Sequence, residues 1–169
     1  MSTSPVDLSA FDKRSLLDSV DAQLRGEIEA ATARARATAA SATHEEARAE
    51  DDKDTRAIEE SYLARGQAQR VADLEHDRAL LRSMELRPRT PNSPVVVGSL
   101  VRIEDDDGVR TVLLVPAGGG RRIEALGESI QLVTPNAPLG AALIGSRVDD
   151  DFELNLRGKV REVVVVAVG

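Results

Sequence analysis

Residues 43–62 read THEEARAEDDKDTRAIEESY, and the fold depends on what the chain does at the acidic run 50–54 in their middle. From residue 8 to residue 87 there is no proline and there are only two glycines, and Ala, Glu, Arg, Leu and Asp dominate. Such a composition favours helix. A turn at 51–54 divides the segment into two helices of similar length. A turn at Thr43, which begins a capping box, is an alternative, and we prefer the turn at 51–54.

The two helices are predicted to pack as an antiparallel coiled coil. Small or apolar residues recur at steps of three and four along the first helix, and a second such run ends before Pro88. If the chain folds back near residue 52, Val20 faces Met84 and Thr38 faces Gly66. Each arm then has a length of about 50 Å at the helical rise per residue. We expect the first helix to begin at Ser9, which has the spacing of a capping box.

The pattern changes after the hairpin. Residues 87–94, RPRTPNSP, contain three prolines and predict a linker. Alternating and β-branched residues then predict short strands separated by turns such as the acidic EDDDG, and a short helix from Pro138 to Gly145. The predicted domains are a helical hairpin at 1–87 with its tip at about 43–55, a linker at 88–94, and a small β-rich domain at 95–169. The fold class is therefore α+β.

Composition excludes several classes of function. The net charge of −7 gives no support for general nucleic-acid binding, and the absence of cysteine excludes disulfides and thiolate chemistry. The polar start MSTSPVDLSA predicts no signal peptide, and no segment predicts a membrane span, so we expect a cytoplasmic protein. The content of 2% aromatic residues predicts thin, aliphatic cores. Nothing in the sequence predicts a tightly bound cofactor.

One stretch resembles a known family. Residues 136–145, NAPLGAALIG, are similar to the NSPIARALIG stretch of the Gre family of bacterial transcript-cleavage factors, with Leu139 and Gly140 as mild changes. Val148-Asp149-Asp150 also resembles the short acidic turn of that family. The helical hairpin and the linker resemble the rest of the Gre architecture, and the tip sequence Asp51-Asp52-Lys53-Asp54 is similar to the Gre tip.

The resemblance implies a fold and a mechanism. The β domain would be FKBP-like and antiparallel, and would dock on the rim of the secondary channel of RNA polymerase while the hairpin enters the channel. Tip carboxylates would help to hold a Mg²⁺ ion of the polymerase active centre during cleavage of backtracked RNA. This chain would be a monomeric stimulator rather than an enzyme, and would meet the RNA 3′ end only indirectly. The residues implied are Asp51 and Asp54 as shared metal ligands, Asp52 and Glu50 beside them, and Thr134, Asn136, Pro138, Leu139 and Leu143 for partner binding.

Two further readings remain open from the sequence. Tyr62 follows Asp51 by eleven positions, which is about one helical turn more than in the family pattern. A tip displaced in this way favours a channel-binding inhibitor that does not cleave, because catalysis depends on accurate placement. The second reading is a coiled-coil adaptor unrelated to polymerase, in which the acidic run is a solvated turn.

Overall fold

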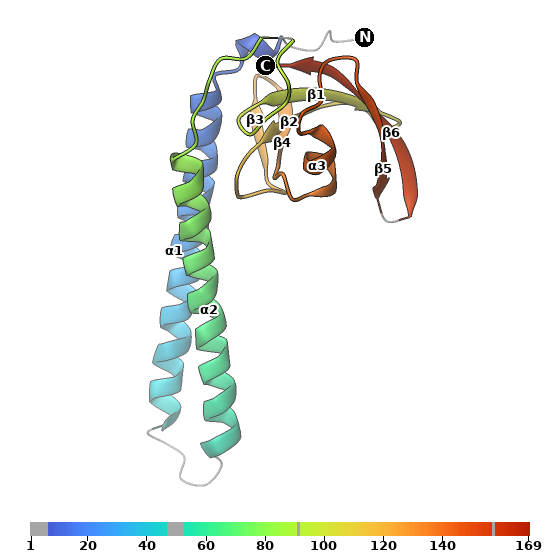
Figure 1. Cartoon of the computed structure of the whole chain (residues 1–169). Helices are drawn as coiled ribbons and strands as arrows, with labels where there is room; N and C mark the ends of the chain where they lie inside the picture. Colours follow the sequence, from blue (N-terminus) through green and yellow to red (C-terminus); the bar gives the residue numbers. More distant parts are fainter. Residues whose placement is uncertain (1–6, 47–52, 91, 157) are drawn as a thin grey trace. The chain divides into compact units, whose positions relative to one another are not determined.

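The computed structural model describes residues 7–46, 53–90, 92–156 and 158–169, and it does not describe the side chains at 42–46, 53–57 and 156. Two long helices precede a β-rich region with one short helix (Figure 1). In chain order the elements are the 3₁₀ turn η1 (Leu8–Ala10), α1 (Lys13–Glu46), α2 (Lys53–Arg82), β1 (Leu100–Asp105), β2 (Gly108–Leu114), β3 (Arg122–Ala125), β4 (Glu128–Val133), α3 (Pro138–Leu143), β5 (Asp151–Leu156) and β6 (Lys159–Val168). The predicted α+β class is confirmed.

The helices α1 and α2 have 34 and 30 residues. The alternative turn at Thr43 is wrong, because α1 continues without interruption through that residue to Glu46. Helix-favouring residues on both sides of Thr43 outweigh its capping potential. The preferred turn at 51–54 is partly corrected, since Lys53 and Asp54 already belong to α2. Residues 47–52 lie outside the described part of the chain. None of the described helices is both long and apolar enough to cross a membrane.

The first helix begins later than its capping box predicts. Ser9 lies in η1, where its backbone N–H donates to the carboxylate of Asp7 at 3.0 Å. Asp12 caps α1 instead, and its carboxylate accepts from the N–H of Arg14 at 3.0 Å and from the hydroxyl of Ser15 at 2.6 Å. Phe11 between them is extended and buried. Burial of this ring explains why the helix does not start at Ser9.

The chain forms two compact units. One contains Asp21–Ala79, and the other contains Leu80–Gly169 together with the N-terminal residues up to Val20. The domain boundaries derived from the sequence, at 87 and 95, stay a prediction.

Within Asp21–Ala79, polar side chains link the two helices. Arg78 on α2 binds the carboxylate of Asp21 on α1, with Nε at 2.6 Å and Nη2 at 3.1 Å. Farther along, Gln67 donates to the hydroxyl of Thr38 at 3.2 Å. The sequence pairs Thr38 with Gly66, so the observed contact lies within one residue of the predicted antiparallel pairing.

The β region forms one six-stranded sheet in the order β3-β4-β2-β1-β6-β5. Neighbouring strands are antiparallel except β2 and β4, which pair in parallel from Thr111 with Ile130 to Leu114 with Val133. The expectation of an antiparallel domain is therefore corrected for this pair. The β3–β4 hairpin joins the sheet through its second strand, which brings β4 alongside β2. Local hairpin signals in the sequence do not specify which strand of a hairpin attaches to the sheet.

One face of the sheet packs against α3. Alternation along the strands sends every second side chain to this face, and α3 closes the core with two leucines. The buried residues of this core are Val95, Val101, Ile103, Val112, Leu114, Val133, Leu139, Leu143, Leu154, Val163, Val165 and Val168. The core is entirely aliphatic, as the low aromatic content predicts, although Phe152 packs at its edge.

Candidate functional site

The acidic tip of the hairpin is the first candidate site. Glu50, Asp51 and Asp52 lie outside the described residues, and Asp54 lies in the first turn of α2 with its side chain not described. In the described part of the chain no three His, Asp or Glu side chains are grouped so that they would bind a metal ion. The roles of Asp51 and Asp54 as shared Mg²⁺ ligands stay a prediction.

Apolar side chains near the start of α2 are a feature that the sequence reading missed. Ile58, Tyr62 and Leu63 are 53%, 69% and 53% exposed. Ile58 and Tyr62 are four residues apart and therefore lie on the same helical face.

The second candidate site is the surface around α3, for which five partner-binding residues are predicted. Asn136 and Pro138 are exposed and Thr134 is half-buried, so these three residues can meet a partner. Leu139 and Leu143 are 8% and 0% exposed and belong to the core. Their assignment to a docking surface is corrected in this respect, because their side chains face the sheet. The sequence alone could not separate the inner face of α3 from its outer face.

Gly140 brings α3 close to the segment before it. A Cβ atom at this position would lie far inside van der Waals contact with the backbone carbonyl oxygen of Thr134. The Gre stretch has Ala here, and the sequence reading treats the change as mild. The structure corrects this, because the glycine permits an approach of α3 to Thr134 that an alanine would obstruct.

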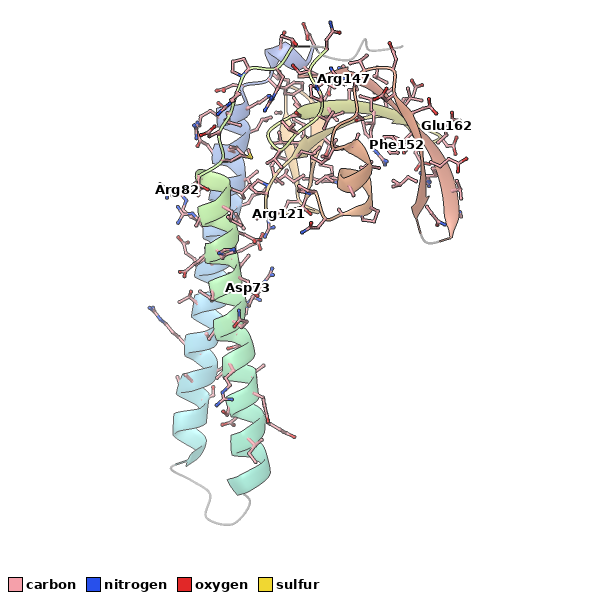
Figure 2. The ribbon with its side chains drawn as sticks, viewed as in Figure 1. Asp73, Arg82, Arg121, Arg147, Phe152 and Glu162 are labelled. Atoms are coloured by element: carbon pink, nitrogen blue, oxygen red, sulfur yellow. The ribbon has the colours of Figure 1, made fainter. Side chains whose placement is uncertain are left out.

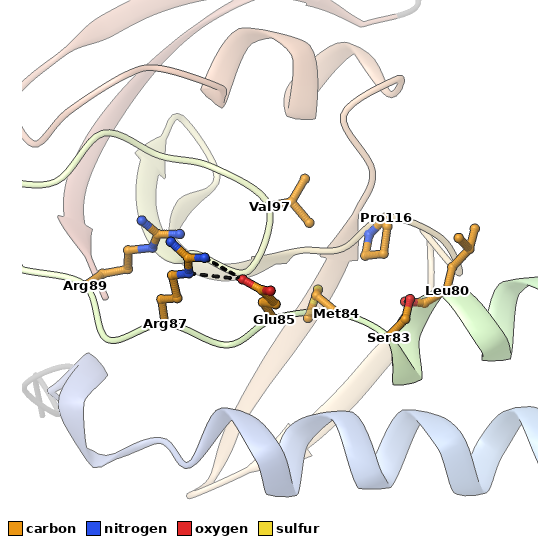
Figure 3. Close-up of a pocket in the computed structure, with 8 residues that line it drawn as sticks. All are labelled: Leu80, Ser83, Met84, Glu85, Arg87, Arg89, Val97 and Pro116. Carbon is orange, nitrogen blue, oxygen red and sulfur yellow. Dashed lines mark hydrogen bonds and ion pairs between the residues drawn. The ribbon is translucent and has the colours of Figure 1, made fainter.

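The segment after α2 lines a pocket of about 390 Å³ (Figure 3). The Glu85 carboxylate accepts from Nη2 of Arg87 at 2.7 Å and from its Nε at 3.1 Å. Both side chains are largely exposed, so the pair contributes little to stability. The pocket is lined by Leu80, Ser83, Met84, Glu85, Arg87, Arg89, Val97 and Pro116.

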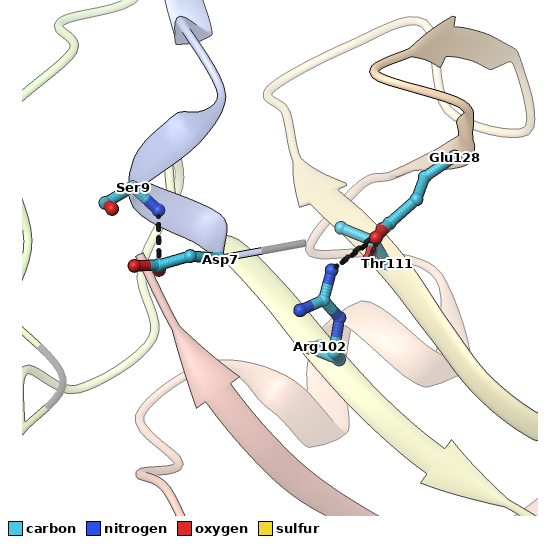
Figure 4. Close-up of polar contacts among 5 residues, drawn as sticks. All are labelled: Asp7, Ser9, Arg102, Thr111 and Glu128. Carbon is cyan, nitrogen blue, oxygen red and sulfur yellow. Dashed lines mark hydrogen bonds and ion pairs between the residues drawn. The ribbon is translucent and has the colours of Figure 1, made fainter. Parts of the chain in front are cut away.

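A buried ion pair lies on the face of the sheet opposite α3 (Figure 4). Arg102 on β1 donates through Nη2 to both carboxylate oxygens of Glu128 on β4, at 3.0 and 2.8 Å. Thr111 on β2 donates to the same carboxylate at 3.0 Å. The Arg102 side chain is 5% exposed, so this contact satisfies a charge that would otherwise be costly to bury. The arrangement fixes three strands and points to a structural role.

The turn between β1 and β2 confirms the prediction of an acidic hairpin turn. The carboxylate of Asp105 accepts from the N–H of Asp107 at 2.9 Å, and Gly108 has a φ of 107°. Arg161 on β6 binds the carboxylate of Asp107 and holds the pKa of that carboxyl below its ordinary value. These contacts account for Asp105 and Asp107 as parts of a hairpin turn.

Arg147, which is labelled in Figure 2, joins the linker to the loop before β5. Its guanidinium donates to the carbonyl oxygen of Asn92, and its backbone N–H donates to the carboxylate of Asp150 at 2.7 Å. The backbone of Val95 is held at the same place, with its N–H on the carbonyl of Ser146 at 2.8 Å. The end of the linker is thus fixed to the segment that follows α3.

The comparison with protein families gives one match. The family model for the C-terminal domain of the transcription elongation factors GreA/GreB matches residues 90–169. This segment contains the whole sheet and α3. No match was found among the curated proteins.

The solved structures that resemble the chain include Gfh1 of Thermus aquaticus, at 22% identity and a TM-score of 0.38, covering 86% of this chain and 91% of that one. GreA factor homolog 1 of Thermus thermophilus has 21% identity and a TM-score of 0.35, covering 88% and 94%. The prokaryotic elongation factor GreA/GreB of Nitrosomonas europaea has 25% identity and a TM-score of 0.33, covering 56% and 78%.

Proposed function

We propose that this chain is a diverged member of the GreA/GreB family of transcription elongation factors, whose C-terminal domain model matches residues 90–169. In this proposal it binds RNA polymerase and modulates elongation through its helical hairpin. One observation carries the proposal: this domain occurs in the same chain as two long helices with an acidic run between them. A hairpin of this kind would carry these carboxylates at the turn between its two helices.

In this proposal the hairpin enters the secondary channel of the polymerase with its acidic tip foremost. Asp51 and Asp54 are the carboxylates that would reach a Mg²⁺ ion of the polymerase active centre, and Glu50 and Asp52 would add negative charge beside them. Mg²⁺ prefers hard oxygen ligands and commonly takes one or two carboxylates from a protein. Two metal ions can then stabilise the attacking and leaving oxygens during RNA hydrolysis. The catalytic centre belongs to the polymerase, so this chain acts as a non-enzymatic factor. In the same proposal the factor is cytoplasmic and monomeric.

The docking surface is proposed on the outer side of α3. Asn136 and Pro138 are exposed there, Thr134 is half-buried beside them, and Ile144 is 41% exposed at the end of the helix. These residues replace Leu139 and Leu143 as the side chains that would touch the polymerase. A patch with polar residues around one apolar residue is typical of a non-obligate interface.

A transcript-cleavage assay on stalled, backtracked polymerase tests the tip. We expect the full-length factor to shorten the backtracked RNA, and the double variant Asp51→Ala, Asp54→Ala to lose this activity while still binding the polymerase. The matched control is Glu59→Ala plus Glu60→Ala, which removes two carboxylates from the described part of α2. Cleavage that is absent, or unchanged by the tip variant, would rule out a cleaving role for the tip.

The spacing of eleven positions between Asp51 and Tyr62 favours a second candidate, a channel-binding inhibitor that does not cleave. An inhibitor would bind the polymerase and compete with a cleaving factor, and its wild-type form would produce no cleavage. The same assay with a cleaving factor added separates the two candidates. Failure to bind polymerase in a pull-down would contradict both and would favour the adaptor reading.

A further inference from the structure

A groove in the compact unit that contains the sheet is lined by several cationic side chains. Lys13 and Arg14 come from the start of α1, Arg87 and Arg89 from the segment after α2, and Arg102 from β1. The groove has a volume of about 700 Å³, which is within the range of small-molecule sites. The chain as a whole carries a net charge of −7, so a cluster of cationic side chains differs from the overall charge of the protein.

Lys13 is half-buried in this groove and has no carboxylate partner among the described residues. Its Nζ donates to the backbone carbonyl oxygen of Gly98 at 3.0 Å. An ammonium group has three donors, so this bond leaves two of them for other acceptors. Burial, and then the nearby charge of Arg89, lower the pKa of Lys13. Two cations therefore lie close enough to repel each other in a partly desolvated place.

Arg89 is the second cation of the groove that has no carboxylate partner among the described residues. Its Nε atom is buried and has no hydrogen-bond partner in the described part of the chain. The neighbouring arginines differ in this respect, because Arg87 is paired with Glu85 and Arg102 with Glu128. A buried donor left without a partner is costly and is uncommon in folded proteins. The Nε–H group of Arg89, a residue that lines the groove, thus lacks a hydrogen-bond acceptor among the described residues.

The acidic groups of the groove are already engaged. Asp7 accepts the N–H of Ser9, and Asp12 accepts the N–H of Arg14 as the cap of α1. A backbone acceptor of the groove is engaged as well, because the carbonyl of Gly169 accepts from the N–H of Leu100 at 2.8 Å. A purely structural role explains the bond of Lys13 to Gly98. It does not explain why Arg89 lies near Lys13 with its Nε unsatisfied.

We propose that this groove binds a small molecule through a phosphate group held between Lys13 and Arg89. A phosphate carries up to two negative charges and several acceptor oxygens, so one group can accept from an ammonium and a guanidinium together. Arg14 also lines the groove and adds a third positive charge. Binding of a phosphate would offset the repulsion between Lys13 and Arg89.

The groove is larger than a phosphate group, and part of its lining is apolar. Leu86, Pro88, Val148 and Val166 belong to this part. A phosphate ester with a ring or a sugar would bury its less polar part there, so a nucleotide fits better than inorganic phosphate. The proposal concerns the isolated factor and does not rest on its action at RNA polymerase.

The test is calorimetric titration of the full-length chain, without polymerase, with inorganic phosphate, pyrophosphate, ATP and citrate as separate probes. We expect ATP and pyrophosphate to bind more tightly than phosphate, and citrate to bind weakly. Lys13→Gln and Arg89→Gln should each weaken ATP binding about tenfold or more, because a hydrogen bond to a charged group typically contributes about 1.5–3 kcal/mol. Lys159→Gln and Arg82→Gln are matched controls outside the groove and should leave the affinity unchanged.

Four results would overturn the proposal: no binding of any probe at millimolar concentration, unchanged affinity in both groove variants, equal losses in the control variants, or citrate binding as tightly as pyrophosphate. Lys13 also holds Gly98, so Lys13→Gln has to be checked for its thermal unfolding. If that variant unfolds, Arg89→Gln alone decides, since its Nε makes no hydrogen bond within the described chain.

Discussion

Gly140 is a residue at which a single methyl group should change the stability of the molecule. A Cβ there collides with the backbone carbonyl of Thr134, and backbone yields less readily than a flexible side chain. We expect Gly140→Ala to lower the free energy of unfolding by about 1–3 kcal/mol, the usual cost of overpacking. Urea unfolding followed by circular dichroism measures the change.

The control for Gly140→Ala is Ala141→Ser on the neighbouring exposed position of α3, which should change stability little. A Gly140→Ala variant as stable as the wild type would show that α3 can shift away from Thr134. In that case the close approach is a consequence of the glycine and not a requirement of the fold.

Asp12 predicts a pH dependence at the start of α1. The hydroxyl of Ser15, and then the N–H of Arg14, hold the pKa of Asp12 below its ordinary value of 3.8. A carboxyl with a lowered pKa in the folded state stabilises the fold above its unfolded pKa, and this contribution is lost as the pH falls through the folded pKa. Asp12→Asn retains an acceptor for the cap but does not titrate. We expect the wild type to be more stable than Asp12→Asn near pH 7.

That advantage of the wild type should shrink as the pH falls below about 4, towards the lowered pKa of Asp12. Thermal unfolding of both proteins between neutral and strongly acidic pH measures the difference. Asp18→Asn, on the exposed side of α1, serves as the reference for a general charge effect. A difference that stays constant over the whole range would exclude Asp12 as the titrating cap.

At the scale of whole elements, both long helices carry a glycine that packing does not require. A Cβ atom at Gly26 in α1 or at Gly66 in α2 meets nothing within 4 Å. We expect Gly26→Ala and Gly66→Ala each to stabilise the hairpin by about 0.5–1 kcal/mol, because glycine loses more conformational freedom than alanine in a helix. Far-ultraviolet circular dichroism during heating measures this gain.

The two helical variants and Gly140→Ala form a matched set, since the same substitution should act in opposite directions. Destabilisation by Gly26→Ala would mean that the groove between α1 and α2 at this position has a partner or a packing role. That groove is lined by Gln23, Gly26, Glu27, Ala30, Ala31, Arg34, Arg70 and Leu74.

The elements themselves could be predicted because their signals are local. Helical composition, proline positions and strand alternation gave two long helices, six strands and α3 near their observed places. The start of α1 was missed, because the burial of Phe11 is a tertiary effect. The parallel pairing of β2 with β4 was missed for the same reason. At the candidate site, the inward direction of Leu139 and Leu143 depends on which face of α3 meets the sheet, and sequence spacing does not specify it.

At the scale of the whole molecule, the compact unit that contains the sheet also contains the first turns of α1 and the last residues of α2. Lys13 bonds Gly98, and the backbone oxygen of Glu85 lies 3.3 Å from the position of a Cβ at Gly98. At the end of α2, the side chain of Leu81 lies close to the position that a Cβ atom at Gly118 would take. The buried side chains that these helical and N-terminal segments contribute to the unit are Leu8, Phe11, Leu16, Leu17, Val20, Leu81 and Met84.

The face of the sheet opposite α3 needs a cover. Leu100, Leu113, Ile130 and Leu132 alternate with core residues along their strands, and all four are fully buried. We infer that η1, the first turns of α1 and the end of α2 provide this cover within the unit. A domain boundary at residue 95, as predicted from the sequence, would separate these four side chains from their cover.

A fragment consisting of residues 90–169 should therefore be much less stable than the full chain. Exposing four fully buried aliphatic side chains costs about 6–12 kcal/mol, which is an upper estimate because the unfolded chain already buries some apolar surface. The total stability of a domain is about 5–15 kcal/mol. We expect the fragment to bind a hydrophobic dye and to unfold at a lower temperature than the full chain. A control chain that replaces only residues 21–79 by a short flexible linker should keep the cover and remain dye-free. If the fragment instead unfolds at the temperature of the control chain and binds no dye, the β domain is independent, and the boundary at residue 95 predicted from the sequence is correct.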